Sequence, residues 1–260
     1  MLLSGEYQIR QIRELERLRS LPAKELRLVG MPYLDSMLRR LEADGPLPPH
    51  PVTVLLAPSW GASGILSRYG SEIIRALLET GYHLITRPHP QSFTAEKERM
   101  EALMKEFPES DQLEWNRDND NYPVLRRSDI MISDFSGVIF DYSLVFGKPV
   151  IYADTEFDKS PYDACWLSEE LWTFRVLPKI GRPLRQEEFG YLKELIGSML
   201  DNPSYEEAIR EAREETWTHI GSAAALAADY LIEKQQALLD EGRTAGAGKT
   251  AERAGKEATA

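Results

Sequence analysis

The sequence predicts an α/β protein built on a doubly wound parallel sheet of the Rossmann type. Short apolar segments recur from residue 52 onward, as in 52–57, 83–86 and 150–152, and they have the length of strands buried on both faces. The segments between them, such as 66–80 and 93–107, place apolar residues at helical spacing. Strands and helices that alternate in this way form a parallel sheet with helices on both faces.

The stretch 128–152 shows this alternation most clearly. Residues 130–132 are a fully apolar strand, Ser136 has the position of a helix N-cap, and Gly147 ends the helix before the next strand. A helix that begins at the carboxyl end of a parallel strand presents free N–H groups and the positive end of its dipole. We therefore expect an anion site at this turn.

The remaining segments differ in composition. Residues 1–43 contain a helix and a short strand, and the proline-rich segment 43–51 predicts a linker. The predicted Rossmann-type domain covers 52–235 with its closing helices, which break near Gly221. Within it, 154–184 lacks a regular pattern and predicts a long loop with one short helix. Residues 242–260 have no large apolar side chain and predict a disordered tail.

Composition excludes several functions. The chain has 31 basic and 42 acidic residues, and its formal charge of −11 argues against a nucleic-acid partner. Its single cysteine excludes an internal disulfide and a cysteine metal cluster, as suits a protein of the cytoplasm. No run approaches the ~20 apolar residues that span a bilayer. We see no metal-ligand set in the sequence and expect no cofactor.

Three loops are expected to meet at one edge of the sheet, namely 58–64, 87–90 and 134–138. Arg87 is suited to bind a phosphate with two hydrogen bonds, and His89 to act as a hydrogen-bond donor or acid. The backbone N–H groups of Gly137 and Val138 complete a predicted phosphate site. Each residue also has a structural interpretation: His89 as a packed turn residue, Arg87 as a surface ion pair and Ser136 as a cap alone.

The acidic residues near these loops allow several interpretations. Asp134 and Asp141 could orient Arg87 or His89, or bind a hydroxyl group, and Asp141 could instead be a solvated helix residue. Asp118 and Asp120 could hold a divalent ion on a bound pyrophosphate, although a capping role in their loop agrees better with the sequence.

Four motifs carry a resemblance to a known family, namely LLAPSW at 55–60, RPHP at 87–90, SDFSGVIFDY at 133–142 and GKPVIY at 147–152. They resemble the CDP-glycerol glycerophosphotransferase family, whose members elongate teichoic-acid-like polyol phosphate polymers. Residues 29–35 and 217–230 also resemble the family, so the match covers roughly 4–232. It implies a glycosyltransferase-B-like fold, with two Rossmann-type halves and a cleft between them.

The resemblance implies that residues 52–235 are the half that binds a cytidine nucleotide donor. Arg87 and His89 would contact the donor pyrophosphate as catalytic candidates, and Ser136, Gly137 and Val138 would bind phosphate. The other residues implied to lie near the donor are Asp134, Asp118, Asn119, Asn121, Asp141, Ser59 and Trp60. Gly137 departs from the pattern, because many members have a second serine there.

The resulting hypothesis is a transferase that moves a polyol phosphate from CDP-glycerol or a related CDP-alcohol. Its acceptor would be a cell-surface polyol phosphate polymer or a lipid-linked acceptor, reached by peripheral contact at the inner face of the cell membrane. The 50 residues before the second half leave no room for the family's first half. We therefore interpret 1–43 as a remnant of it, expect a truncated chain, and consider a separate N-terminal-half partner.

Two alternatives remain open at this point. One is a nucleotide-sugar glycosyltransferase or epimerase of the same fold, which would differ in the base that it recognises. The other is a non-catalytic nucleotide-binding half that requires a partner chain.

Overall fold

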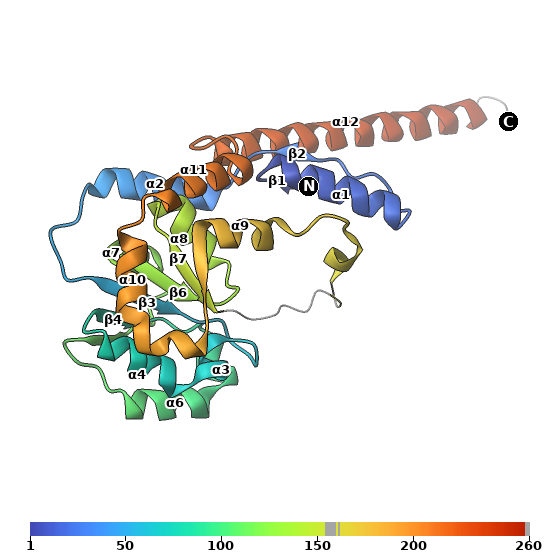
Figure 1. Ribbon diagram of the computed structural model, residues 1–260. Coiled ribbons are helices and arrows are strands. Elements are labelled where there is room, and N and C mark those ends of the chain that lie inside the picture. Colours follow the sequence, from blue (N-terminus) through green and yellow to red (C-terminus); the bar gives the residue numbers. More distant parts are fainter. Residues whose placement is uncertain (154–159, 161, 258–260) are drawn as a thin grey trace.

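A six-stranded parallel sheet forms the centre of the computed structural model, which describes residues 1–153, 160 and 162–257 (Figure 1). The strand order is β5-β4-β3-β6-β7-β8, and every pair of neighbours is parallel. The strands are β3 (Thr53–Ala57), β4 (His83–Thr86), β5 (Leu113–Trp115), β6 (Ile130–Ser133), β7 (Val150–Ala153) and β8 (Gly181–Leu184). This arrangement confirms the predicted doubly wound sheet.

The strand order reverses between β3 and β6. The chain runs outward from β3 through β4 to β5, returns to β6 on the other side of β3, and continues to β7 and β8. The loops after β3 and β6 therefore leave the sheet side by side and diverge to opposite faces. A crevice opens at such a switch point, at the carboxyl ends of the strands.

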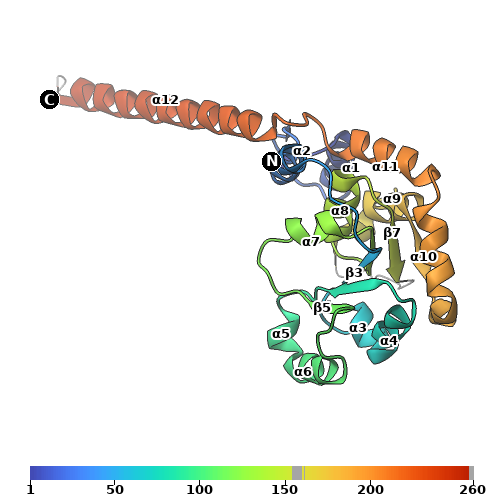
Figure 2. The same cartoon turned by 90° about the vertical axis from the view of Figure 1, so that its left-hand side faces the viewer.

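Helices cover both faces of the sheet (Figures 1 and 2). Leu55 and Leu56 are adjacent on β3 and belong to opposite hydrophobic cores, as the alternation of a strand requires. The core of Leu56 is covered by α3 (Ile65–Tyr69), α4 (Ser71–Glu79), α5 (Ser92–Ala95), α6 (Lys97–Glu106) and α10 (Leu192–Leu200). The core of Leu55 is covered by α2 (Pro32–Asp44), α7 (Tyr122–Arg127), α8 (Val138–Phe146), α9 (Trp172–Ile180) and α11 (Ser204–Thr216).

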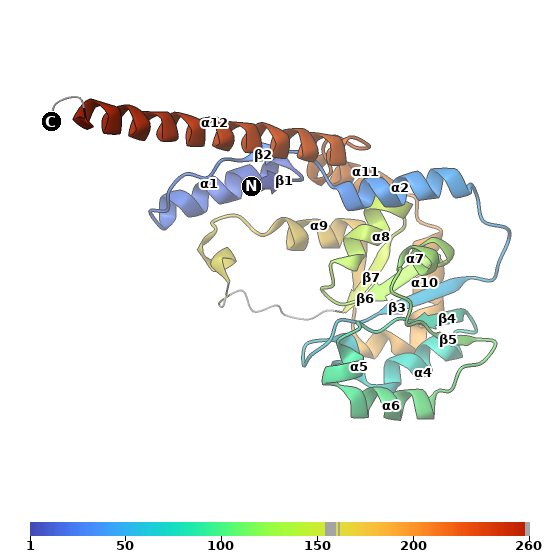
Figure 3. The same cartoon turned by 180° about the vertical axis from the view of Figure 1, so that it is seen from behind.

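The N-terminal segment and the start of the last helix lie together above the second of these cores (Figure 3). The strands β1 (Leu2–Leu3) and β2 (Arg27–Leu28) form a small parallel sheet, and α1 (Glu6–Leu18) connects them. The last helix, α12 (Ala223–Glu257), passes over this small sheet and projects away from the domain. The buried Asp35 of α2 accepts hydrogen bonds from the Trp217 indole at 2.8 Å and from the Ala223 backbone N–H at 2.9 Å. These bonds tie α2 to the start of α12.

One region differs from the expectation. The region 154–184 contains α9 and the edge strand β8 in addition to a short 3-10 helix, Asp163–Trp166, while 154–159 and 161 lie outside the described residues. The sequence did not predict β8 because it contains Pro183, and proline within a strand is tolerated mainly at the edge of a sheet, where β8 lies. The chain breaks near Gly221 as expected, and α12 begins at Ala223 and extends to Glu257. Residues 258–260 lie outside the described residues.

No helix in the described part of the chain is long and apolar enough to cross a membrane.

Candidate anion site at the switch point

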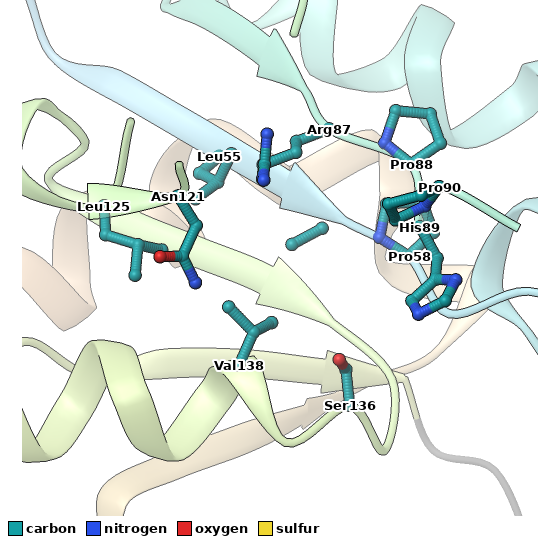
Figure 4. A pocket seen from close by; sticks show the side chains of 11 residues that line it. Leu55, Pro58, Arg87, Pro88, His89, Pro90, Asn121, Leu125, Ser136 and Val138 are labelled. Carbon is teal, nitrogen blue, oxygen red and sulfur yellow. The ribbon is translucent and has the colours of Figure 1, made fainter. Parts of the chain in front are cut away.

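A small pocket of about 140 Å³ lies at the switch point, where the ends of β3, β4 and β6 meet (Figure 4). Its wall combines apolar side chains with a few polar groups: Leu55, Ala57, Pro58, Arg87, Pro88, His89, Pro90, Asn121, Leu125, Ser136 and Val138. Backbone hydrogen bonds from Arg87 N–H to the Leu56 carbonyl and from His89 N–H to the Pro58 carbonyl hold the β3 and β4 loops together. The structure thus brings together five of the residues predicted from sequence: Arg87, His89, Asn121, Ser136 and Val138.

Arg87 brings an unpaired positive charge to the pocket. Its guanidinium donates to Asn116 Oδ1, and it forms no ion pair within 4 Å in the described part of the chain. Burial lowers the pKa of Arg87, and the more distant charges of Asp118 and Asp120 oppose that shift. A half-buried guanidinium without a carboxylate partner is a site for an incoming anion.

Asn116 holds Arg87 in place and was not predicted as a site residue. It is 5% exposed, and its amide nitrogen donates to Asp118 Oδ2 at 2.9 Å and to Glu114 Oε1 at 3.1 Å. These bonds fix the amide so that its oxygen faces Arg87. Its position at the end of β5 is the signal that could have identified it, because that strand ends at the same edge of the sheet.

His89 is exposed at the rim, and its ring is oriented by a hydrogen bond. The Gln91 backbone N–H donates to His89 Nδ1 at 3.1 Å. A backbone N–H can only donate, so Nδ1 is unprotonated and the neutral ring carries its hydrogen on Nε2. His89 is therefore set up as a hydrogen-bond donor through Nε2.

The turn before α8 supplies three further donors. Helix α8 begins at Val138 with Gly137 as N-cap, and no side chain caps it, so the prediction of Ser136 as the N-cap was wrong. The Ser136 carbonyl instead accepts from the Ile139 N–H, which leaves its side chain free to face the pocket. Within the described residues, the Ser136 hydroxyl and the N–H groups of Gly137 and Val138 have no hydrogen-bond partner in the protein.

Asp134 lies beneath this turn and does not line the pocket. It is 1% exposed, and its Oδ2 accepts from the backbone N–H groups of Ser59 at 2.8 Å and Ile65 at 3.0 Å. Its Oδ1 accepts from the Phe135 N–H at 2.8 Å. Asp134 therefore joins the β3 loop to the end of β6. Ser59 contributes only its N–H to this connection. The Trp60 side chain is 49% exposed and does not line the pocket.

Asp141 lies one turn into α8, and its carboxylate has no hydrogen-bond partner among the described residues. Burial raises its pKa to about 6. Burial and the charge of Asp141 raise the pKa of Tyr33. Tyr33 is a second residue that the sequence did not predict, because it belongs to α2, far from the three loops in sequence.

Of the polar residues in the loop after β5, one lines the pocket and others bond to the rest of the protein. Asn121 lines the pocket, Asn119 is exposed, and Asp118 accepts from Asn116. Asp120 pairs with Arg40, at 2.8 Å for the closer nitrogen. In the described part of the chain, no three His, Cys, Asp or Glu side chains are grouped as metal ligands.

The donors around the pocket suit an anion with several oxygens. Arg87 and His89 Nε2 come from the loop after β4, the Ser136 hydroxyl and the N–H groups of α8 come from the loop after β6, and all of them meet at one cavity (Figure 4). The cavity is smaller than the roughly 300–1,000 Å³ that encloses a whole drug-sized ligand. It therefore suits the phosphate part of a larger molecule, whose remainder would extend outside it.

Comparison with known proteins identifies the family. The family model described as CDP-Glycerol:Poly(glycerophosphate) glycerophosphotransferase matches residues 3–166, which is more than half of the chain. The chain belongs to this family. The match includes all the polar pocket residues described above. No match was found among curated proteins.

Solved structures confirm the fold. The wall teichoic acid polymerase TagF is 19% identical over 92% of this chain and 56% of its own, with a TM-score of 0.53. A putative UDP-N-acetylglucosamine 2-epimerase from Listeria monocytogenes is 16% identical over 85% of this chain and 57% of its own, with a TM-score of 0.52. The chain thus spans a little over half the length of these proteins.

Proposed function

We propose that this chain is the donor-binding part of a transferase that moves a polyol phosphate from a CDP-alcohol, such as CDP-glycerol, to a growing polyol phosphate polymer or a lipid-linked acceptor. One observation carries the proposal: a pocket at the switch point combines the unpaired Arg87 with free N–H groups at the start of α8, in a chain of the glycerophosphotransferase family. A TagF variant soaked with CDPG is among the similar structures, which supports this donor class.

In the proposed reaction, the acceptor hydroxyl oxygen attacks the phosphorus that carries the alcohol. The bond from this phosphorus to the oxygen that bridges the two phosphates breaks, and cytidine monophosphate leaves with that oxygen. The hydroxyl proton passes to a base or to water. Such phosphoryl transfer depends mainly on positioning and on stabilising the charge that develops on the phosphate oxygens.

The pocket residues then take complementary roles. Arg87 and the N–H groups of Gly137 and Val138 stabilise the charge of the diphosphate, and the Ser136 hydroxyl adds a neutral donor. His89 donates from Nε2 to the leaving oxygen, in agreement with the tautomer set by Gln91. Arg87 and His89 are the proposed catalytic residues.

The nucleotide and alcohol would extend from the pocket toward Asn121 and Asp141. Asp141 is the nearby carboxylate without a hydrogen-bond partner in the described residues, and a carboxylate can accept from two hydroxyl groups of a diol. The loop that contains Asp118 and Asn119 is connected to Arg87 through Asn116, whose amide nitrogen donates to Asp118. Asp134, Ser59 and Trp60 contribute to the donor site only by shaping the β3 loop.

The acceptor, its location and its partner are further parts of the proposal. We place the chain at the inner face of the cell membrane, in peripheral contact, where lipid-linked polymers are extended. An N-terminal half in another polypeptide would supply the acceptor side.

Titration calorimetry of the full chain with CDP-glycerol, CDP-ribitol and a UDP-sugar tests the donor class. We expect both CDP-alcohols to bind, and Arg87→Gln to raise the Kd by about 10- to 100-fold, because charge-assisted hydrogen bonds are lost. Arg210→Gln is the control, because Arg210 is exposed and pairs only with glutamates of α11, and it should leave the Kd of every ligand unchanged. Failure of all three ligands to bind would contradict the nucleotide assignment.

The same titration examines the alternatives. The similarity to a UDP-N-acetylglucosamine 2-epimerase favours a nucleotide-sugar enzyme as the second candidate, and preferential binding of the UDP-sugar would support it. A non-catalytic half would bind the CDP-alcohol but transfer nothing, even when an N-terminal half is supplied. Transfer by the mixture that is lost in His89→Ala would exclude that alternative.

A further inference from the structure

Tyr33 at the start of α2 reaches a pocket residue from outside the predicted site. Its phenol donates a hydrogen bond of 2.8 Å to Asn121 Oδ1. Asn121 lines the pocket, and its amide nitrogen has no hydrogen-bond partner among the described residues. Figure 4 shows that this nitrogen points toward Val138 and the cavity, while the oxygen points away.

The direction of this hydrogen bond has a chemical consequence. An asparagine amide can present either its acceptor oxygen or its donor nitrogen to a cavity, and its partners decide which. An inward oxygen would repel a phosphate, whereas an inward NH₂ group would bind it. Because Tyr33 occupies the oxygen, the donor side of Asn121 is the side that faces the pocket.

The start of α2 is held firmly enough to serve this purpose. Gly30 precedes it with a φ of 90°, and a Cβ there would lie 2.1 Å from the Thr218 carbonyl oxygen. The buried Asp35 anchors the first turn to Trp217. The position of Tyr33 is therefore fixed by α2 and by the segment that follows α11, rather than by the pocket loops.

The same helix makes other contacts with the segment of Asn121, and these serve for comparison. Arg40 pairs with Asp120, and the Tyr122 hydroxyl donates to Asp44 Oδ2 at 2.8 Å. These contacts hold the backbone of the loop, but neither involves a side chain that lines the pocket. Tyr33 differs from them because its partner is a pocket residue.

We infer that Tyr33 is a positioning residue that orients the Asn121 amide as a hydrogen-bond donor to the donor's diphosphate. The inference rests on the proposed function for the identity of the ligand. The phenol of Tyr33 is protonated at neutral pH, as an ordinary tyrosine is, and can therefore donate to Asn121.

A double-mutant cycle measured by calorimetry tests the inference, with CDP-glycerol and inorganic pyrophosphate as separate probes of the full chain. Tyr33→Phe removes one hydroxyl and should raise the Kd of both probes about 3- to 10-fold, the effect of one hydrogen bond. Asn121→Ala should raise it by a similar factor. The double variant should equal Asn121→Ala, because Tyr33 acts through Asn121.

Tyr122→Phe is the matched control, since it also removes a tyrosine hydrogen bond of 2.8 Å between α2 and this loop. It should lower the unfolding temperature and leave both Kd values unchanged. An unchanged Kd in Tyr33→Phe, or losses that multiply in the double variant, would overturn the inference alone. A wild-type chain that binds neither probe would overturn the proposed function together with it.

Discussion

Asp134, at the base of the β6–α8 turn, and Asp141, in the first turn of α8, are two carboxylates of one βα unit that differ in their hydrogen bonding. At the base, Asp134 accepts three backbone N–H groups and holds two loops together. One turn into the helix, Asp141 is largely buried without a hydrogen bond among the described residues, and its pKa is raised to about 6. The hydrogen bonds of the first carboxylate are supplied by the fold, whereas the described residues supply none to the second.

The same difference separates Arg87 from other arginines near the sheet. Arg127 is paired with Glu114 and Arg40 with Asp120, whereas Arg87 is bound only by a neutral amide. Unpaired charge in a half-buried position costs stability, and proteins retain such groups mainly at functional sites. Arg213 of α11 is also half-buried without an ion pair in the described part of the chain, so the missing partner marks Arg87 only together with its place in the pocket wall.

The largest effect is expected at the base of the turn. Asp134→Ala leaves the N–H groups of Ser59, Ile65 and Phe135 without their acceptor, so we expect it to lower the free energy of unfolding by at least about 3 kcal/mol. Urea denaturation measures this, with the exposed Asp111→Ala as control. A loss below about 1 kcal/mol would show that Asp134 does not build the turn.

Asp141→Asn should raise the free energy of unfolding, in contrast to Asp134→Ala. A raised pKa means that the folded state favours the protonated carboxyl, so ionisation destabilises the protein as the pH rises from about 4 to about 6. The amide should therefore stabilise the fold by up to about 3 kcal/mol above pH 6, and the gain should vanish near pH 4. Urea denaturation at pH 4, 6 and 8 measures it, and a gain that is independent of pH would contradict the assignment.

The same variant should bind the donor less well. If Asp141 accepts hydroxyl groups of the ligand, Asp141→Asn should raise the Kd for CDP-glycerol about 3- to 10-fold while the fold becomes more stable. A stabilised variant with unchanged affinity would instead make Asp141 a buried group without a role in binding.

The smallest effect is expected at Gly137. Its φ of −58° suits any residue, and a Cβ there would have no heavy atom within 4 Å. Gly137→Ser should therefore fold normally, and its hydroxyl should lower the Kd for CDP-glycerol about two- to fivefold. Gly137→Ala is the control, because it makes the same backbone change without the hydroxyl. Equal affinities of the two variants would show that a hydroxyl at this position does not reach the phosphate.

The sequence was sufficient to predict the sheet and the meeting of Arg87, His89, Ser136 and Val138, since buried parallel strands have a clear apolar pattern and their carboxyl ends share one edge. Asn121 could also be placed there, through the family resemblance. These predictions follow from local patterns combined with one topological rule.

Other features could not be predicted, because they depend on three-dimensional packing. Nothing in the sequence separates Asp134 from Asp141, since their different roles arise from which backbone N–H groups reach them. Tyr33 contacts the pocket residue Asn121 only because α2 packs against α8 in the folded chain. The start of α8 at Val138 reflects a turn in which the Ser136 carbonyl, rather than its side chain, accepts a hydrogen bond.

The central claim is that the switch-point pocket binds the diphosphate of a CDP-alcohol, and NMR titration of the backbone amides with CDP-glycerol tests it most directly. The account predicts that the N–H resonances of Gly137 and Val138 are among those that shift most, because they gain a charged acceptor that the protein itself does not provide. Saturable binding that leaves both resonances unchanged, with shifts gathered instead around the separate hollow between Glu72 and Phe189, would contradict it.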